Sequence, residues 1–154
     1  MSEQTRPTPS FSLTNKEEIH ELIAEFRSSS LPRERWTHRA HLIVGLWHVW
    51  HHGAEIALQE LRASIPKLNE FHGVANSDNS GYHESITRWY VAIMKRYIAG
   101  FHNETDFETL INTFLKSPYG EHPYLLKYYS REVIGSTAAR RGWVPPDLLS
   151  LEDG

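Results

Sequence analysis

The stretch best suited to chemistry is 36–52, which reads WTHRAHLIVGLWHVWHH and contains five histidines among tryptophan and aliphatic residues. His38 and His41 stand three residues apart, a spacing that puts both imidazoles on the same side of a helix. Neutral imidazole binds Zn²⁺ and Fe²⁺ and also serves as a general acid or base. The pair therefore predicts a polar or metal site, although an HxxH pair alone is weak evidence because it is common.

A second candidate segment is GYHESIT, residues 81–87, which follows a run of turn-forming residues. Loops and helix starts often carry functional side chains. We assign His83 as a third metal ligand. Successive helical residues point about 100° apart, so we assign neighbouring Glu84 as a catalytic residue that orients a ligand or transfers protons. The alternative for Glu84 is an ordinary helix ion pair with Arg88, four residues later.

These two segments need a fold that brings them together. Residues 37–52 are too many for a typical strand and are predicted to form a buried helix. Gly53 separates this helix from a second one over 54–69, so the two should run antiparallel. The next helix, at about 82–99, then starts near the beginning of the first. The side chains expected at this end of the bundle are those of His38, His41, Asn69, His72, His83 and Glu84.

One face of the helix at 82–99 should point into the bundle beside these histidines. The stripe on this face contains His83, Thr87, Tyr90 and Met94. We assign Thr87 and Tyr90, together with Asn69, to substrate binding or to the support of metal ligands. Each also has an ordinary structural role available, since aromatic helix residues are usually core and Asn often closes a helix end.

The remaining histidines of the first stretch, His48, His51 and His52, lie at its other end. We expect them to cap this helix end, where the helix dipole favours imidazolium. The alternative for His38 and His41 is similarly structural: histidines of the core whose nitrogens are satisfied by hydrogen bonds.

The chain as a whole is predicted to be all-α, a compact bundle of about five or six helices around the central helix. Residues 1–12 should be a flexible lead-in, and 13–154 a single domain. Pro66 should kink or end the last turn of its helix, and the tail should dock through Trp143, Leu148 and Leu149. The expected helices span 15–28, 37–52, 54–69, 82–99, 105–116 and 124–134.

Composition excludes several classes of function. The net charge is −3 with neutral histidines, so no basic field attracts nucleic acid. There is no cysteine, which excludes disulfides and thiolate metal sites and fits a cytoplasmic protein. Neither a secretion signal nor an apolar run long enough for a membrane span is present. The sequence leaves undecided whether the protein forms a homodimer, because the helix at 105–116 and the tail could pack on a second copy as easily as on the core.

The segments WTHRAHLIVGLWHVW and LNEFHGVANSDNSGYHESITRWYV resemble an uncharacterised bacterial family of small helical proteins. Its pattern is close to THxAHL, a YNE-like segment, GYHETIT and an aromatic pair. The match covers 36–91, and Ser85 stands where the family pattern has Thr. The resemblance implies no reaction. The signature positions that it implies are His38, His41, Asn69, His83, Glu84 and Thr87.

Two hypotheses follow from the sequence. The first is a small metal-dependent enzyme, a hydrolase or an iron oxygenase, in which three histidines hold one Zn²⁺ or Fe²⁺ for a small-molecule substrate. Glu84 would then handle protons. The second is a non-catalytic helical module that binds a small ligand or a protein, with histidines that are hydrogen-bonded core or pocket groups.

Overall fold

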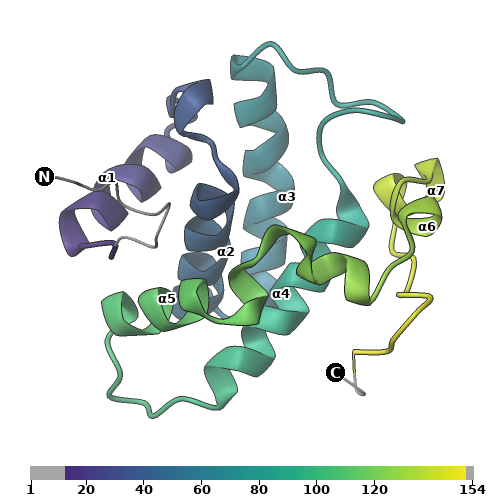
Figure 1. The fold of residues 1–154 in the computed structure, drawn as a ribbon. Coiled ribbons are helices and arrows are strands. Elements are labelled where there is room, and N and C mark those ends of the chain that lie inside the picture. Colours follow the sequence, from purple (N-terminus) through teal and green to yellow (C-terminus); the bar gives the residue numbers. More distant parts are fainter. Residues whose placement is uncertain (1–12, 152–154) are drawn as a thin grey trace, which may run out of the picture.

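The computed structural model describes residues 13–151 and is an all-α bundle, as predicted (Figure 1). Within this range there is no strand, only an isolated bridge between Ser77 and Ser80. The predicted lead-in of 1–12 lies outside the described residues. The α-helices are α1 (Lys16–Arg27), α2 (His38–His52), α3 (Ala54–Phe71), α4 (Glu84–Ala99), α5 (Phe107–Lys116), α6 (Arg131–Ile134) and α7 (Thr137–Arg141). Short 3₁₀ helices are η1 (Arg33–Arg35), η2 (Pro118–Gly120) and η3 (His122–Lys127).

Helix α2 is the centre of the bundle. It packs against α1 and α5 on one side and against α3 and α4 on the other (Figure 1). Leu42, Ile43 and Leu46 are all at most 4% exposed, so this helix is buried on several faces as its composition indicates. Its start is fixed by the Thr37 side chain, which accepts a hydrogen bond from the Ala40 N–H at 3.1 Å.

Helix α3 returns alongside α2 after the sharp turn at Gly53, whose φ of 82° suits glycine. Pro66 does not end the last turn, because α3 continues to Phe71, and a kink at Pro66, the other predicted alternative, stays a prediction. The loop that follows ties itself to this region: the Asn76 amide donates to the Pro66 carbonyl at 3.1 Å. The loop therefore stays close to α3 on its way to α4.

The predicted continuous helix over 124–134 is wrong. The chain forms η3, then a turn, and then the separate helix α6. Tyr128 and Tyr129 are at most 1% exposed, and Ser130 accepts a hydrogen bond from the Val133 N–H at 3.1 Å. A serine that caps a new helix ends the one before it. A surface helix buries only one of its sides, so a continuous helix here would not bury both of these adjacent tyrosines.

The C-terminal tail docks through polar contacts and not through the predicted leucines. The Ser85 hydroxyl donates to the Gly142 carbonyl at 2.7 Å and accepts from the Val144 N–H at 2.9 Å. Leu148 is 57% exposed and Leu149 37% exposed, so neither side chain anchors the tail, although the Leu148 N–H donates to the Tyr128 carbonyl at 2.9 Å. Of the three predicted anchors only Trp143 is partly buried.

Helix α5 covers the core of its own chain, because Leu110, Ile111 and Phe114 are fully buried. No helix within the described residues is both long enough and apolar enough to cross a membrane.

Candidate functional site

A cavity of about 360 Å³ lies between α2, α3, α4 and η3. Most of its wall is apolar. The apolar wall comes from Leu42, Val44, Gly45, Leu61, Ile65, Ile86, Val91, Met94 and Leu125. The polar and aromatic lining comes from Trp36, His38, His41, Thr87, Tyr90 and His122. No acidic residue, lysine or arginine lines it.

Gly45 lets α4 come close to α2 beside this cavity. A Cβ at this position would lie 3.1 Å from the Sδ and Cε atoms of Met94, which is tighter than ordinary contact. Met94 therefore occupies space that a larger residue on α2 would take. The flexible Met94 thioether forms part of the cavity wall at this point.

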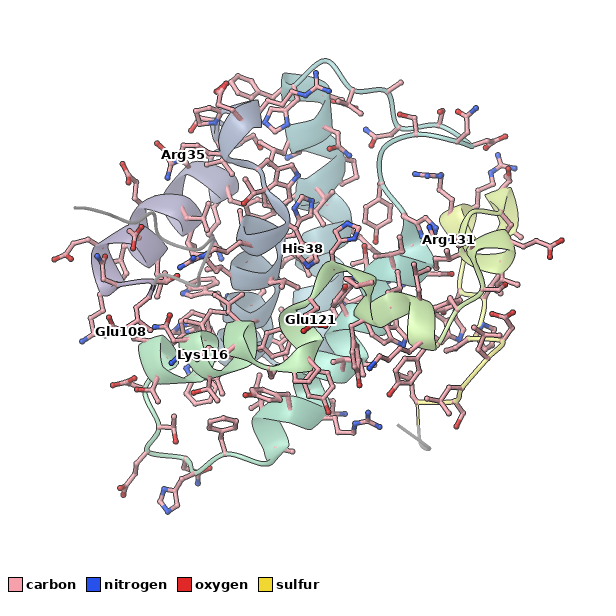
Figure 2. The ribbon with its side chains drawn as sticks, in the orientation of Figure 1. Arg35, His38, Glu108, Lys116, Glu121 and Arg131 are labelled. Atoms are coloured by element: carbon pink, nitrogen blue, oxygen red, sulfur yellow. The ribbon has the colours of Figure 1, made fainter. Side chains whose placement is uncertain are left out.

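His38 is the first residue of α2 and faces the segment between η2 and η3 (Figure 2). Its ring centroid is 4.8 Å from that of His122. Its Nε2 is buried and has no hydrogen-bond partner in the described part of the chain. Burial lowers the pKa of His38, His122 lowers it further, and a backbone hydrogen bond with Gly120 opposes both. The ring is therefore a neutral imidazole near pH 7.

His41 borders the same cavity and stacks on Trp36, with ring centroids 3.7 Å apart. Its Nδ1 lies 2.7 Å from the Thr37 carbonyl. The side chain is exposed and borders the cavity, while Trp36 covers one face of the ring. Desolvation lowers the pKa of His41 to about 4, although the Thr37 carbonyl opposes this shift. His41 is therefore also neutral near pH 7.

Two further predicted residues, Thr87 and Tyr90, line the cavity together with Met94. The stripe predicted for α4 is thus confirmed for these three. Burial raises the pKa of Tyr90 to about 12, so its hydroxyl keeps its proton at any ordinary pH. The Thr87 hydroxyl donates to the His83 carbonyl at 2.8 Å.

His83, by contrast, is not among the residues that line the cavity. It caps α4, with Nδ1 accepting from the Ile86 N–H at 3.1 Å, while Nε2 donates to the Ile134 carbonyl at 2.7 Å. Both ring nitrogens are thus engaged. Burial and Arg140 lower the pKa of His83, which suits an uncharged cap. Among residues 13–151, no three His, Asp or Glu side chains are grouped to share a metal ion, and the metal site stays a prediction.

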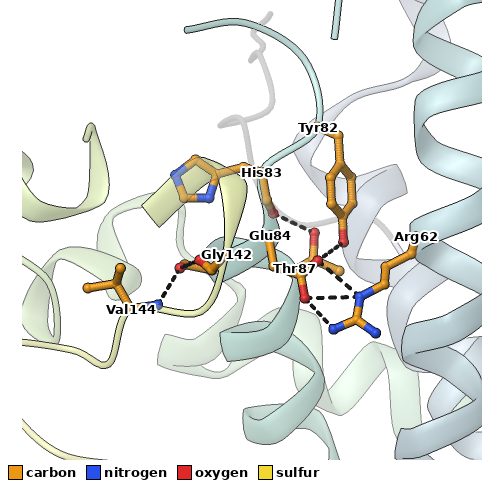
Figure 3. Close-up of polar contacts among 8 residues, drawn as sticks. Arg62, Tyr82, His83, Glu84, Thr87, Gly142 and Val144 are labelled. Carbon is orange, nitrogen blue, oxygen red and sulfur yellow. Dashed lines mark hydrogen bonds and ion pairs between the residues drawn. The ribbon is translucent and has the colours of Figure 1, made fainter. Parts of the chain in front are cut away.

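Glu84 joins α4 to α3 (Figure 3). Its carboxylate accepts from the Arg62 Nε at 2.9 and 3.0 Å, from Arg62 Nη2, and from the Tyr82 hydroxyl at 2.8 Å. Burial raises the pKa of Glu84, but the hydrogen bonds from Arg62 and Tyr82 outweigh it, and the pKa lies below its usual value. The nearby Arg88 instead lies over the Trp143 ring, at 4.8 Å.

Asn69 organises the loop before α4. Its amide donates to the Asn76 side-chain oxygen at 2.9 Å, and that oxygen also accepts from the Tyr82 N–H at 3.0 Å. His72 likewise makes a structural contact, with Nε2 2.8 Å from the Leu31 carbonyl. These residues hold the loop that leads to the cap, and neither lines the cavity.

At the other end of α2, His48 is 1% exposed and belongs to the core. Its Nδ1 lies 2.7 Å from the Val44 carbonyl, and its Nε2 is 3.7 Å from Glu60. Because the Val44 carbonyl lies in the middle of α2 and not in its last turn, His48 does not cap this helix end as predicted. Burial lowers the pKa of His48. Desolvation also lowers the pKa of His51.

Sequence reasoning missed His122, Arg62 and Tyr82. His122 reaches the cavity from eighty-four residues after His38, and nothing in its spacing relates it to the HxxH pair. Arg62 looks like an exposed charge of an amphipathic helix, and Tyr82 like an aromatic of the first turn of the predicted helix at 82–99. The packing of α3 on α4 pairs Arg62 with Glu84, whereas Tyr82 reaches Glu84 from two residues away.

No protein-family model, curated protein or solved structure matches this chain. The resemblance based on the THRAHL and GYHESIT segments stays a prediction.

Proposed function

We propose that this protein binds a small, mostly apolar organic molecule in the cavity between α2, α3, α4 and η3. Ligand sites are typically concave, largely apolar and equipped with a few convergent polar groups. The cavity has this character: its volume is about 360 Å³, and its polar groups are mainly three imidazoles and two hydroxyls. We keep a cytoplasmic location, inferred from the absence of cysteine, as part of this proposal.

The observation that carries the proposal is the buried Nε2 of His38, which has no partner. A buried polar atom without a hydrogen bond costs about 1–3 kcal/mol. A ligand that supplied the missing bond would remove this cost. His83 and Glu84 offer no comparable vacancy, because their polar atoms are already hydrogen-bonded.

Binding of 2-naphthol, followed by isothermal titration calorimetry, tests the proposal. A probe of this size in a well-formed cavity should bind with a Kd of about 0.1–1 mM. Thr87→Phe should weaken binding at least about tenfold, because the ring would fill the cavity.

Thr113→Phe is the matched control. Thr113 makes the same hydroxyl bond to the carbonyl four residues earlier, at 2.8 Å, but it is exposed on α5. Its substitution should leave the Kd of 2-naphthol unchanged. Equal binding to both variants would place the probe outside the cavity, and no binding to the unmodified protein would contradict the proposal.

A metal-dependent enzyme is the second candidate, and the free lone pairs of His38 and His41 favour it. Zn²⁺ and Fe²⁺ bind neutral imidazole, and both rings are neutral near pH 7. His83 would need to give up the cap of α4 to join them. Elemental analysis of untagged protein tests this candidate. Less than about a tenth of an equivalent, with no uptake on reconstitution, would remove it.

A further inference from the structure

The hydrogen bonds already made by the cavity residues restrict what its ligand can offer. A carbonyl oxygen can only accept a hydrogen bond, so His41 Nδ1, 2.7 Å from the Thr37 carbonyl, must carry the proton. In a neutral imidazole the other nitrogen is then a bare acceptor. His41 therefore presents Nε2 as a lone pair.

His38 lines the same cavity as His41. Its Nε2 is buried and has no hydrogen-bond partner in the described part of the chain. With the proton on Nδ1, as in His41, this Nε2 is also an acceptor without a donor.

Thr87 has no donor left for a ligand, because its hydroxyl proton is used in the bond to the His83 carbonyl at 2.8 Å. The Tyr90 hydroxyl can serve as donor or acceptor and does not restrict the ligand. The two lining groups whose bonding is fixed, His41 and Thr87, therefore offer no donor.

Charge restricts the ligand as well. No Asp, Glu, Lys or Arg side chain lines the cavity. An ammonium or carboxylate would leave water without an opposite charge to compensate, which is costly in an apolar site. The lowered pKa values of His38 and His41 keep these rings from supplying a positive charge.

We propose that the cavity selects an uncharged molecule with a flat apolar body and a hydrogen-bond donor, such as a phenol or an indole N–H, and that Nε2 of His38 and His41 accept this bond. This inference rests on the proposed ligand-binding function and gives the chemical class of its ligand. The aromatic Trp36, stacked on His41, supplies a surface for the flat body.

The test compares three probes that share one ring system: 2-naphthol, 2-methoxynaphthalene and 2-naphthoate, titrated at pH 7 in EDTA. 2-Naphthol should bind about tenfold more tightly than the methyl ether, which lacks the donor. The carboxylate should bind more weakly still. His38→Phe should reduce the preference for naphthol over its ether to about twofold.

His51→Phe is the matched control, because His51 lies on the same helix, is exposed and does not line the cavity. It should keep the tenfold preference. Long-range ¹H–¹⁵N spectra of the unmodified protein give a readout that needs no variant, and they should show unprotonated Nε2 at His38 and His41.

The outcomes separate the two proposals. Equal binding of naphthol and its ether would overturn the donor inference while the binding function stands. Tight binding of naphthoate would overturn the restriction to uncharged ligands. A naphthol preference that appears only when Zn²⁺ replaces EDTA would also overturn it, because the lone pairs would then hold metal. If none of the three probes binds, the binding function itself fails.

Discussion

The two histidine segments that the sequence groups together end in opposite chemical states. At the start of α2, His38 has a buried nitrogen without a partner and borders a cavity. At the start of α4, His83 uses both nitrogens, and Glu84 accepts hydrogen bonds from two side chains. Both helices start at a histidine, but only His38 has a ring nitrogen that is left without a hydrogen bond and could bind a ligand. At these two helix starts, hydrogen-bond saturation distinguishes the structural His83 from His38, the histidine that we propose to bind a ligand.

The largest expected effect tests the structural half of this comparison. His83→Ala removes the cap of α4 and leaves the partly buried Ile134 carbonyl without its donor, so it should lower the free energy of unfolding by about 2 kcal/mol. Urea denaturation followed by circular dichroism measures this loss.

His38→Phe is the counterpart in the binding half. It removes a buried nitrogen that has no partner, so it should destabilise the protein by no more than about 1 kcal/mol. His83→Asn, which keeps a capping oxygen, should recover about 1 kcal/mol of the loss. If His38→Phe destabilised the protein as much as His83→Ala, the distinction between the two starts would be lost.

A smaller effect is expected on the pH dependence of protein stability, and it tests the environment of His41 at the start of α2. The pKa of His41 is about 4 in the folded protein and 6.5 as its ordinary value. The unfolded chain therefore binds more protons between these values, and stability present above pH 6.5 is lost as the pH falls toward 4. Because solvent reaches the ring, we expect a loss of about 1 kcal/mol between pH 7 and pH 5.

Urea denaturation at both pH values measures this loss, and His41→Gln should reduce it. His48, buried and also with a lowered pKa, contributes in the same direction and should leave a residual dependence. His20→Gln, an exposed change on α1, is the control. An unchanged pH dependence in His41→Gln would show that His41 is not desolvated in the folded protein.

The sequence by itself determined the helices whose signals are local. The apolar content of 36–52 and the turn at Gly53 predict α2 and its antiparallel partner, and the structure has both. The inward face of α4 with Thr87 and Tyr90 was also predictable, because helical periodicity fixes which residues share a stripe.

Only the tertiary structure decided which partners the polar groups find. His83 meets the Ile134 carbonyl, Glu84 meets Arg62, and His38 meets His122, each across twenty-two or more residues of sequence. Hydrogen-bond saturation depends on these long-range contacts and leaves no trace in local spacing. For this reason the sequence identified the histidines that could act, while the packing of α3, α4 and η3 determined that the buried Nε2 of His38 is left without a partner.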